Sequence, residues 1–373
     1  MSYRPTPTSP IGMLEAQGQS LWLDYIHRSM LKSGELKRLI ETRGIRGVTS
    51  NPTIFEQAIA QSDAYDEAIA ALARKGATAE AIYETLVVED IQAACDLFRP
   101  IYEMSGGNDG FVSIEVSPRL AYDGDGTLVE ARRLWGAVAR PNVLIKIPGT
   151  EEGLPAIAAA IAEGINVNVT LLFAVSMYER VVDAYLTGLE RRLAAGGAVD
   201  SIRSVASFFV SRVDTECDRR LSEAGAPPEL QGRAAVANAR LAWQMYLKHF
   251  EGERFRKLMG QGAAVQRPLW ASTGTKNKAY SDVKYVDELI GPDTINTLPP
   301  ATLEAFADHG VARRTIDEGL DQARAHLEAI ERAGVKLEDV TDFLVKDGVK
   351  RFADSFDSLL AAIETKRAVL AAV

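Results

Sequence analysis

A lysine stands inside an apolar run that has the pattern of a β-strand, at residues 142–147 (NVLIKI). A Pro-Gly pair follows the run and ends it. Burial disfavours the charged form of an amine, and a neutral amine is a nucleophile that forms a Schiff base with a ketone or an aldehyde. Lys146 therefore suits covalent carbonyl chemistry. The structural alternative is a lysine with a buried stem whose head reaches solvent or pairs with Glu115, and the pattern alone leaves both open.

Other strand-like runs carry polar side chains on one face. Successive side chains of a strand point to opposite faces, so residues two apart share a face. In FVSIEV, Ser113 and Glu115 share a face. In INVNVT, Asn168 and Thr170 share a face opposite three aliphatic residues. Schiff-base chemistry needs proton donors and acceptors beside the amine, and these side chains would supply them.

The runs that carry these residues belong to a longer alternation of strands and helices. Eight β-like runs recur along the chain, at residues 21–25, 47–50, 111–116, 142–147, 165–170, 204–210, 268–273 and 293–298. Stretches with helical spacing, such as LPAIAAAIAEG, separate most of them. Eight such units predict an α/β protein with a (β/α)8 TIM barrel. The apolar faces then pack against the helices, so Lys146 and the polar faces point into the barrel near the carboxyl ends of the strands, where catalytic groups of such barrels lie.

Two helical segments are additional to the eight strand–helix units of a barrel. A helical excursion occupies about residues 213–265, and the region of about residues 313–373 has a wholly helical pattern. No linker rich in Ser, Gly or Pro separates either segment from the rest of the sequence. We therefore expect a single domain over residues 1–373, in which these helices cover the barrel, edge the active site or form a dimer surface.

Two loops after predicted strands have a functional and a structural interpretation. In GVTSNPTIFEQAI, Asn51 either caps a helix that begins at Pro52 or binds a substrate hydroxyl. In WASTGTKN, backbone N–H groups and Lys276 can cradle a phosphate. The alternative for this loop is a simple turn between a strand and a helix. TIM barrels often bind phosphate at their late strands, which favours the phosphate site.

Composition limits the classes of function. The 373-residue chain has a formal net charge of -9, which argues against general nucleic-acid binding and leaves room for a local cationic pocket that holds a phosphorylated substrate. The apolar runs are too short for a membrane span and the N-terminus has no signal-peptide pattern, so we expect a cytoplasmic protein that does not bind membranes. Cys95 and Cys217 are in no metal or redox spacing, which fits a reducing cytosol.

The sequence also argues against two cofactor routes. The four histidines are far apart and form no helical ligand pair, so a zinc route to carbon–carbon chemistry has no support and we expect no metal. His27 follows the first strand and could line the barrel mouth, although such a histidine is more often an ordinary hydrogen-bonded residue. Neither a P-loop nor a strand-linked GxGxxG occurs, so nucleotide binding is unsupported.

Several motifs taken together resemble the transaldolase family. GVTSNPTIF is similar to its N-terminal signature, and NVLIKIPGTEEGLPAI followed by EGINVNVTLLF resembles its Schiff-base segment. LWLDY, VSIEV and ASFFVSRVD fit the family pattern in order. The matches span about residues 21–298; SNPT alone is weak, but the ordered set is highly specific. The chain length, the WASTGTKN loop and the helical C-terminal region resemble the longer, stand-alone bacterial form within the class I Schiff-base aldolase superfamily.

This resemblance implies a (β/α)8 barrel and a transferase of the non-oxidative pentose phosphate pathway. Such an enzyme reversibly moves a dihydroxyacetone unit from sedoheptulose 7-phosphate to glyceraldehyde 3-phosphate through a lysine Schiff base, giving erythrose 4-phosphate and fructose 6-phosphate. The resemblance implies phosphorylated sugars as the binding partners and neither a metal nor an organic cofactor. A monomer and a homodimer both fit the sequence.

Carried over residue by residue, the resemblance implies a role for each matching position. Lys146 matches the Schiff-base lysine, and Asp24 matches the acid/base that takes the proton from the C4 hydroxyl. Glu115 matches the carboxylate that acts through a water on carbinolamine dehydration, with Thr170 holding that water. The remaining positions match substrate-binding residues: Asn51, Asn168 and Ser207 for the dihydroxyacetone unit, Arg212 for phosphate, and Phe209 and Lys276.

Two of these positions bear on the alternatives. Phe209 falls where transaldolases carry phenylalanine and fructose 6-phosphate aldolases carry tyrosine. Lys276 falls where shorter transaldolases have a second phosphate-binding arginine, and a lysine cannot make the bidentate contact of an arginine. One alternative is a lyase like fructose 6-phosphate aldolase, against which Phe209 and the chain length argue. The other is a non-catalytic, phosphosugar-binding barrel, which the full set of inward polar groups disfavours.

Overall fold

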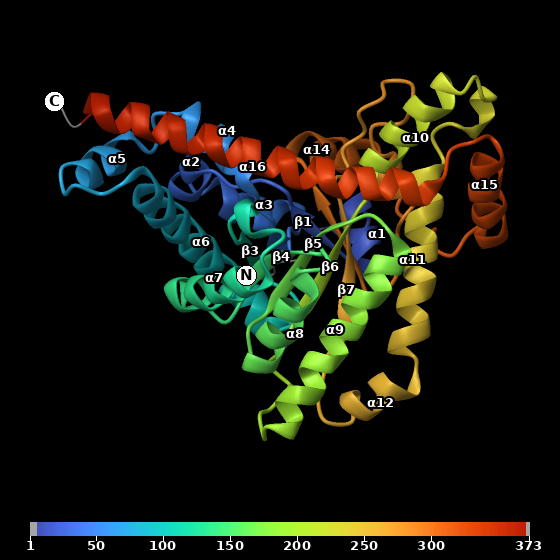
Figure 1. Cartoon of the computed structure of the whole chain (residues 1–373), viewed down its shortest axis with the longest axis horizontal. Coiled ribbons are helices and arrows are strands. Elements are labelled where there is room, and N and C mark those ends of the chain that lie inside the picture. Colours follow the sequence, from blue (N-terminus) through green and yellow to red (C-terminus); the bar gives the residue numbers. More distant parts are fainter. Residues whose placement is uncertain (1–5, 371–373) are drawn as a thin grey trace.

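Eight parallel strands close into a barrel in the computed structural model, which describes residues 6–370 (Figure 1). Each strand pairs with the next along the chain, and the first pairs with the last. The predicted barrel and all eight predicted strands are confirmed, with ends that differ by one or two residues at most positions. The strands are β1 (Gln19–Leu23), β2 (Gly47–Val48), β3 (Phe111–Glu115), β4 (Val143–Pro148), β5 (Val167–Leu172), β6 (Ser204–Phe209), β7 (Gln266–Ala271) and β8 (Thr294–Leu298).

Helices surround the barrel and extend beyond it. Through β8 they are α1 (Pro10–Ala16), α2 (Arg28–Lys32), α3 (Glu35–Arg43), α4 (Pro52–Ala60), α5 (Asp66–Ala73), α6 (Ala79–Met104), α7 (Gly124–Val138), α8 (Gly153–Glu163), α9 (Val175–Ala194), α10 (Ser211–Glu223), α11 (Ala234–Phe250), α12 (Glu253–Met259) and α13 (Lys284–Asp287), with short 3-10 turns η1 (Pro118–Leu120) and η2 (Pro228–Leu230). After β8 follow α14 (Pro300–His309), α15 (Leu320–Arg332) and α16 (Leu337–Leu370). The predicted extra helices are thus α10 to α12 and α15 to α16. Among these described helices, none is long and apolar enough to cross a membrane.

The strands are buried on both faces because helices cover the outside and side chains fill the inside. Every residue of β4, β5 and β6 is buried. Near the amino ends of the strands, Trp22 fills the interior beside Gly47, where a Cβ atom would lie 2.6 Å from two atoms of the indole ring. The Trp22 Nε1–H donates to Asp109 Oδ1 at 2.8 Å, and Ser20 donates to the same carboxylate. These two hydrogen bonds tie β1 to the residues that precede β3.

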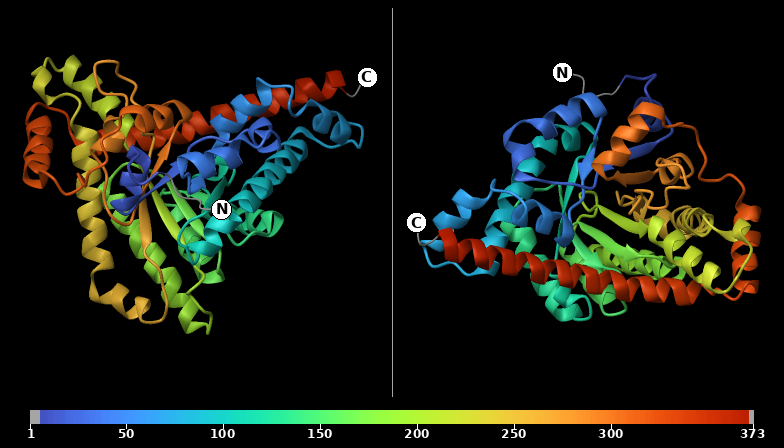
Figure 2. Two further views of the ribbon diagram at one scale, coloured as in Figure 1. Left: turned by 180° about the vertical axis from the view of Figure 1, so that it is seen from behind. Right: turned by 90° about the horizontal axis from the view of Figure 1, so that it is seen from above.

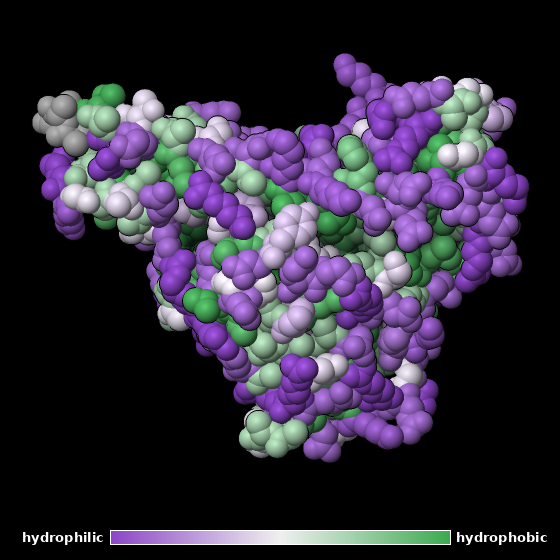
Figure 3. All heavy atoms as spheres, in the orientation of Figure 1, coloured by the Kyte–Doolittle hydropathy of each residue, from purple (hydrophilic) through white to green (hydrophobic). Residues whose placement is uncertain are grey.

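The C-terminal helix α16 runs along one side of the barrel at the carboxyl ends of the strands (Figure 2). It contacts α4, α5, α6 and α10 as well as the end of β5. Gly348 permits the close approach to β5, because a Cβ atom there would lie 2.9 Å from Leu171 Cδ2. Leu171 itself has a φ of 59° at an irregularity in the β5–β6 pairing. The outward surface along α16 is largely hydrophilic, as expected for a helix whose apolar stripe faces the barrel (Figure 3).

Candidate active site

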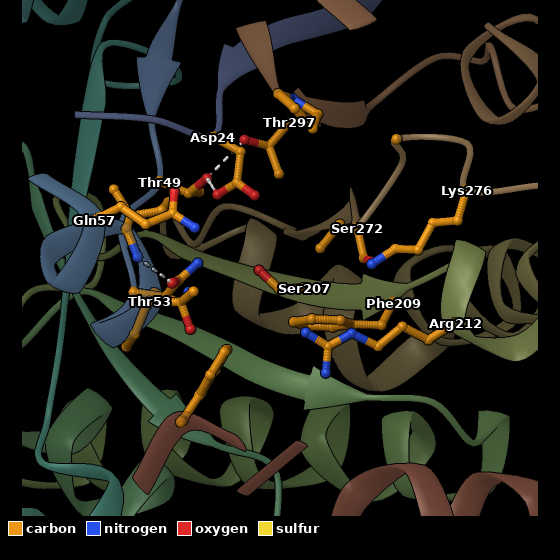
Figure 4. A pocket seen from close by; sticks show the side chains of 17 residues that line it. Asp24, Thr49, Thr53, Gln57, Ser207, Phe209, Arg212, Ser272, Lys276 and Thr297 are labelled. Carbon is orange, nitrogen blue, oxygen red and sulfur yellow. Dashed lines mark hydrogen bonds between the residues drawn. The ribbon is translucent and has the colours of Figure 1, made fainter. Parts of the chain in front are cut away.

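A pocket of about 230 Å³ opens at the carboxyl ends of the strands (Figure 4). Its walls come from the residues that follow β1 and β2, from the carboxyl ends of β6, β7 and β8 and the loops after them, from Lys146 in β4, and from α4 and α16. Most of the residues that the sequence singled out line it: Asp24, Asn51, Lys146, Ser207, Phe209, Arg212 and Lys276. The remaining three, Glu115, Asn168 and Thr170, are buried in strands beside it. The fold therefore brings the predicted positions to one end of one barrel.

Lys146 projects into the barrel from β4 and is only 4% exposed. Its Nζ donates to the backbone oxygen of Ser50 at 3.0 Å and lies 3.3 Å from Glu115 Oε2. In the parallel register, Glu115 and Asn168 are the neighbours of Lys146 on the two adjacent strands. The amine is thus held at the floor of the pocket with a carboxylate at its side, which is the arrangement that carbonyl addition and dehydration require.

Glu115 and Thr170 have buried oxygens with unused hydrogen-bonding capacity. Apart from the 3.3 Å contact between Glu115 Oε2 and Lys146 Nζ, no hydrogen-bond partner among residues 6–370 reaches either carboxylate oxygen of Glu115 or Thr170 Oγ1. Burial raises the pKa of Glu115, while the nearby Lys146 opposes that rise. Buried polar groups of this kind are normally satisfied by ordered water. Both side chains therefore offer buried polar atoms that an ordered water or a ligand could satisfy.

Asp24 ends a short chain of hydroxyl groups across three strands. Thr49 Oγ1 donates to Asp24 Oδ1 at 2.6 Å and lies 2.7 Å from Thr297 Oγ1. Since Thr49 has a single hydroxyl proton, Thr297 donates to it in turn. Burial raises the pKa of Asp24, and the Thr49 hydrogen bond, Lys146 and Arg212 lower it by smaller amounts. A carboxyl group whose pKa moves toward neutrality is suited to accept and return a proton.

Asparagine and serine side chains surround the amine. Asn51 Oδ1 accepts from the backbone N–H of Ile54 at 3.0 Å and so caps α4, while the same residue lines the pocket. The two interpretations of Asn51 are therefore compatible, because the amide nitrogen is left for a ligand oxygen. Asn168 donates to Ser113 Oγ at 2.9 Å and accepts from Ser207 Oγ at 2.7 Å. This link fixes the Ser207 hydroxyl at the pocket wall.

Positive charge gathers at the other side of the pocket. Arg212 is the second residue of α10, and its guanidinium lies 5.4 Å from the centre of the Phe209 ring. Burial lowers the pKa of Arg212 and of Lys276, and the charge of Arg351 in α16 lowers both further. Arg212 Nη1 is buried and has no hydrogen-bond partner in the described part of the chain. Like charges held this close together favour binding of an anion such as phosphate.

Some residues of the pocket were missed by the sequence interpretation. Thr297 shares a face with Ile295 in β8, so the alternation of side chains could have found it, whereas Thr49 follows the two-residue β2 and gave no such signal. Phe352 of α16 lines the pocket as well, and no local pattern could place that helix at the mouth.

His27 does not line the pocket. Its Nδ1 accepts from the backbone N–H of Ser29 at 3.0 Å and caps α2, and its ring stacks on Tyr25. The ordinary structural role is therefore the right one for His27. Within residues 6–370, no cluster of three or more His, Cys, Asp or Glu side chains could hold a metal ion.

Comparison with known proteins shows that the chain is similar to one protein family. The model of the family "Transaldolase/Fructose-6-phosphate aldolase" matches residues 21–363. A transaldolase of Parafrankia sp. (strain EAN1pec) is 50% identical over 359 residues, which cover 95% of this chain and 97% of the relative. Transaldolase 1 of Streptomyces coelicolor is 51% identical over 353 residues, 94% of this chain and 93% of the relative. A transaldolase of Mycobacterium ulcerans is 50% identical over 365 residues, 97% of this chain and 98% of the relative.

Proposed function

This chain belongs to the transaldolase/fructose-6-phosphate aldolase family, and from this premise we propose how its residues divide the steps of the transaldolase reaction. The reaction reversibly transfers a dihydroxyacetone unit from sedoheptulose 7-phosphate to glyceraldehyde 3-phosphate, in the pentose phosphate pathway. Its products are erythrose 4-phosphate and fructose 6-phosphate. The observation that carries the assignment is the buried Lys146 amine, 3.3 Å from Glu115 in the barrel.

Lys146 Nζ attacks the C2 carbonyl of the ketose phosphate and forms a carbinolamine. Glu115, acting through a water that Thr170 helps to hold, protonates the leaving hydroxyl, so the carbinolamine loses water and becomes an iminium ion. The position of Glu115 beside Nζ and its unused oxygens support this role. The iminium ion then acts as an electron sink for cleavage of the next carbon–carbon bond.

Asp24 takes the proton from the C4 hydroxyl when the C3–C4 bond breaks. The aldose phosphate leaves, and the three-carbon unit stays on Lys146 as an enamine. Asn51, Asn168 and Ser207 hold that unit through its hydroxyl groups, since they converge on the space around the amine. The acceptor aldehyde then enters, and the same steps run in reverse. Water must not protonate the enamine meanwhile, which the enclosed barrel interior favours.

Arg212 and Lys276 bind the phosphate of donor and acceptor. Both line the pocket away from Lys146 on the side where α10 and the loop after β7 meet, and Figure 4 shows their side chains extending toward the same region. Phe209 packs under the guanidinium of Arg212 and holds it in place. Phosphorylated sugars are therefore the expected substrates. We also place the enzyme in the cytoplasm, where the free, buried thiols of Cys95 and Cys217 stay reduced.

The assignment is tested by trapping the Schiff base. Incubation with fructose 6-phosphate and borohydride should leave one reduced adduct, and peptide mapping should find it on Lys146. Lys146→Ala should lose the adduct and turnover while keeping its circular dichroism spectrum. Lys276→Ala is the matched control, because Lys276 lines the same pocket and its loss should weaken substrate binding yet leave the adduct on Lys146. An adduct on Lys276, or active enzyme without an adduct, would refute the mechanism.

The same purified enzyme can be used to distinguish transfer of the dihydroxyacetone unit from its release by an aldolase. The family also includes fructose 6-phosphate aldolases, which release free dihydroxyacetone. With fructose 6-phosphate and no acceptor, we expect the bound enamine to accumulate and little dihydroxyacetone to appear in solution. Adding erythrose 4-phosphate should then give sedoheptulose 7-phosphate. Because the reaction needs no metal, a chelator should leave both rates unchanged.

A further inference from the structure

A second, small cavity lies next to Glu115 and apart from the substrate pocket. It has a volume of about 30 Å³ and is enclosed by β3, α6, α7 and Phe356 of α16. Tyr83, Ser117 and Glu130 contribute polar groups to its wall. Glu115 borders this cavity and also touches Lys146 in the substrate pocket. Glu115 therefore lies between the two spaces.

The cavity is large enough for water and polar enough to hold it. One water needs about 10–15 Å³ of such space and two to four polar partners, so about two waters fit. Glu115 lines this cavity, and apart from the contact of Oε2 with Lys146 its buried carboxylate oxygens lack a hydrogen-bond partner in the described residues. The phenol of Tyr83 stays protonated, because burial and the charges of Glu115 and Glu130 raise its pKa. Its hydroxyl is thus a donor for a carboxylate or a water on either side.

Polar groups continue from the cavity to the surface. Glu130 Oε1 accepts from the backbone N–H of Ser117 at 3.2 Å and lies 3.5 Å from Arg133 Nη2. Arg133 in turn bonds Glu84, and both of these side chains are more than one third exposed. Water can therefore pass from solvent along Glu84, Arg133 and Glu130 to Tyr83 and Glu115.

The chemistry of the proposed function needs such a path. When the carbinolamine dehydrates, the C2–O bond breaks, the oxygen takes up a proton and leaves as water, and the nitrogen lone pair forms the C=N bond. When the product imine is hydrolysed, one water is taken up again. During both steps the sugar phosphate occupies the pocket of about 230 Å³ through which water would otherwise come and go.

We propose that the cavity is a side passage that exchanges the catalytic water with solvent while the sugar fills the main pocket, and that Tyr83 and Glu130 are positioning residues of this passage. The proposal rests on the Schiff-base assignment above. Phe356 of α16 and Tyr83 form its roof, with ring centres 5.2 Å apart in an edge-to-face contact. A passage beside Glu115 lets water move without reaching the enamine from the mouth.

Oxygen isotopes test the passage. The enzyme is given fructose 6-phosphate labelled with ¹⁸O at C2, together with erythrose 4-phosphate, and the sedoheptulose 7-phosphate formed is analysed for ¹⁸O at early times, with correction for exchange in a blank without enzyme. In the wild type, the released water should leave through the passage, so the product should carry little label. With the passage blocked, the same water should be reused, and label in the product should rise about three- to tenfold.

Three variants are compared with a matched control. Ser117→Leu fills the cavity, Tyr83→Phe removes the phenol while keeping the ring, and Glu130→Gln removes the charge; all three should raise the retained label. Glu103→Gln makes the same chemical change at an exposed position of α6 that does not line the cavity, and it should behave as wild type. If Ser117→Leu does not fold, the label retained by Tyr83→Phe and Glu130→Gln tests the passage on its own.

The outcome separates this inference from the function on which it rests. Wild-type retention of label in all folded variants, with the borohydride adduct still on Lys146, would overturn the passage and leave the Schiff-base mechanism standing. Absence of the adduct in the wild type would instead refute the mechanism itself. A role of Tyr83 and Glu130 in stability alone would change the amount of folded enzyme but not the fraction of label retained per product.

Discussion

At the scale of single residues, the site works because neighbouring groups hold each side chain in one state. The Thr297–Thr49–Asp24 chain shows this, since each hydroxyl proton has one acceptor and the last acceptor is a carboxylate. Desolvation raises the pKa of Asp24, and the bond from Thr49 limits that rise. Asp24 must be ionised to take the C4 proton. The catalytic activity of the enzyme is therefore lost as the pH falls through the pKa of Asp24 in the folded enzyme.

Thr49→Val should shift the acid limb of the pH profile of kcat/KM to higher pH. The hydroxyl stabilises the ionised form of Asp24, so its removal raises the pKa of Asp24 further and a higher pH is needed for ionisation. Asp24→Asn should lower kcat by on the order of 10²–10⁴. Thr53→Val is the control, because Thr53 lines the pocket but bonds Ser355 instead of Asp24. An unshifted acid limb in Thr49→Val would assign that limb to another group, such as Glu115.

The catalytic candidates were predictable at this scale to the extent that alternation decides which way a side chain points. Lys146 and Asn168 follow from a polar residue on the inward face of a regular strand. Thr49 could not be recognised in the same way, because β2 has only two residues and Thr49 follows it. The distance between Lys146 and Glu115 also depends on strand register, which no single strand contains.

At the scale of secondary structure, α16 contributes to a pocket that the barrel alone would leave open. Its 34 residues bring Phe352 to the pocket wall and Arg351 near the two phosphate-binding candidates. The helical pattern was predictable. The position of α16 on the barrel was not predictable, because the contacts that determine it involve α4, α5 and α10, which are far away in the sequence. Gly348 gave no local signal either, although its missing side chain lets the helix approach Leu171.

Arg351→Gln should raise the KM for fructose 6-phosphate about two- to fivefold and leave kcat nearly unchanged. A full charge near the surface contributes on the order of 0.5–1 kcal/mol to binding a phosphate. Arg351 now pairs with Asp347 at 2.6 Å, so the phosphate has to compete with that carboxylate. Lys350→Gln is the matched control, since Lys350 is the preceding residue and pairs with Asp354 on the exposed face. The difference between the variants should shrink at high salt; equal KM values at low salt would exclude Arg351 from phosphate binding.

The strand β2 gives a second prediction at this scale. Gly47→Ala should lower the free energy of unfolding by about 1–3 kcal/mol, because the new Cβ would meet the buried Trp22 ring at 2.6 Å and the Phe111 backbone oxygen at 2.8 Å. Gly136→Ala makes the same change in the exposed interior of α7, with nothing within 4 Å. It should raise the free energy of unfolding by about 0.5–1 kcal/mol through helix propensity. Urea denaturation of both variants measures whether each change lowers or raises the free energy of unfolding. A Gly47→Ala variant as stable as the wild type would mean that Trp22 can move aside.

At the scale of the whole molecule, the extra helices pack against the barrel over long stretches. The apolar side of α16 includes Leu344, Val349, Phe352, Phe356 and Leu359, all buried in contact with other elements. An interface of this kind favours one cooperative unit over the described residues 6–370. The four tryptophans report on this, because Trp22 and Trp270 are buried in the barrel strands β1 and β7 and α16 contains no tryptophan.

Phe356→Ala should therefore destabilise the barrel and not α16 alone. Removing this 7%-exposed ring should cost about 3–5 kcal/mol. In one cooperative domain, the unfolding midpoints seen by tryptophan fluorescence and by far-ultraviolet circular dichroism coincide and move down together. Phe343→Ala removes the same side chain from the same helix at a 43%-exposed position and should change the midpoint far less.

If α16 instead unfolded separately, Phe356→Ala would produce an early loss of helical signal while the fluorescence of the buried tryptophans kept its wild-type midpoint. Transaldolase activity would then follow the first transition, because Phe352 and Arg351 would leave the pocket before the strands separate. Coincident transitions would mean that the catalytic end of the barrel and its C-terminal helix share one folding equilibrium. In that case, every substitution that weakens α16 also lowers the population of enzyme able to hold the phosphate.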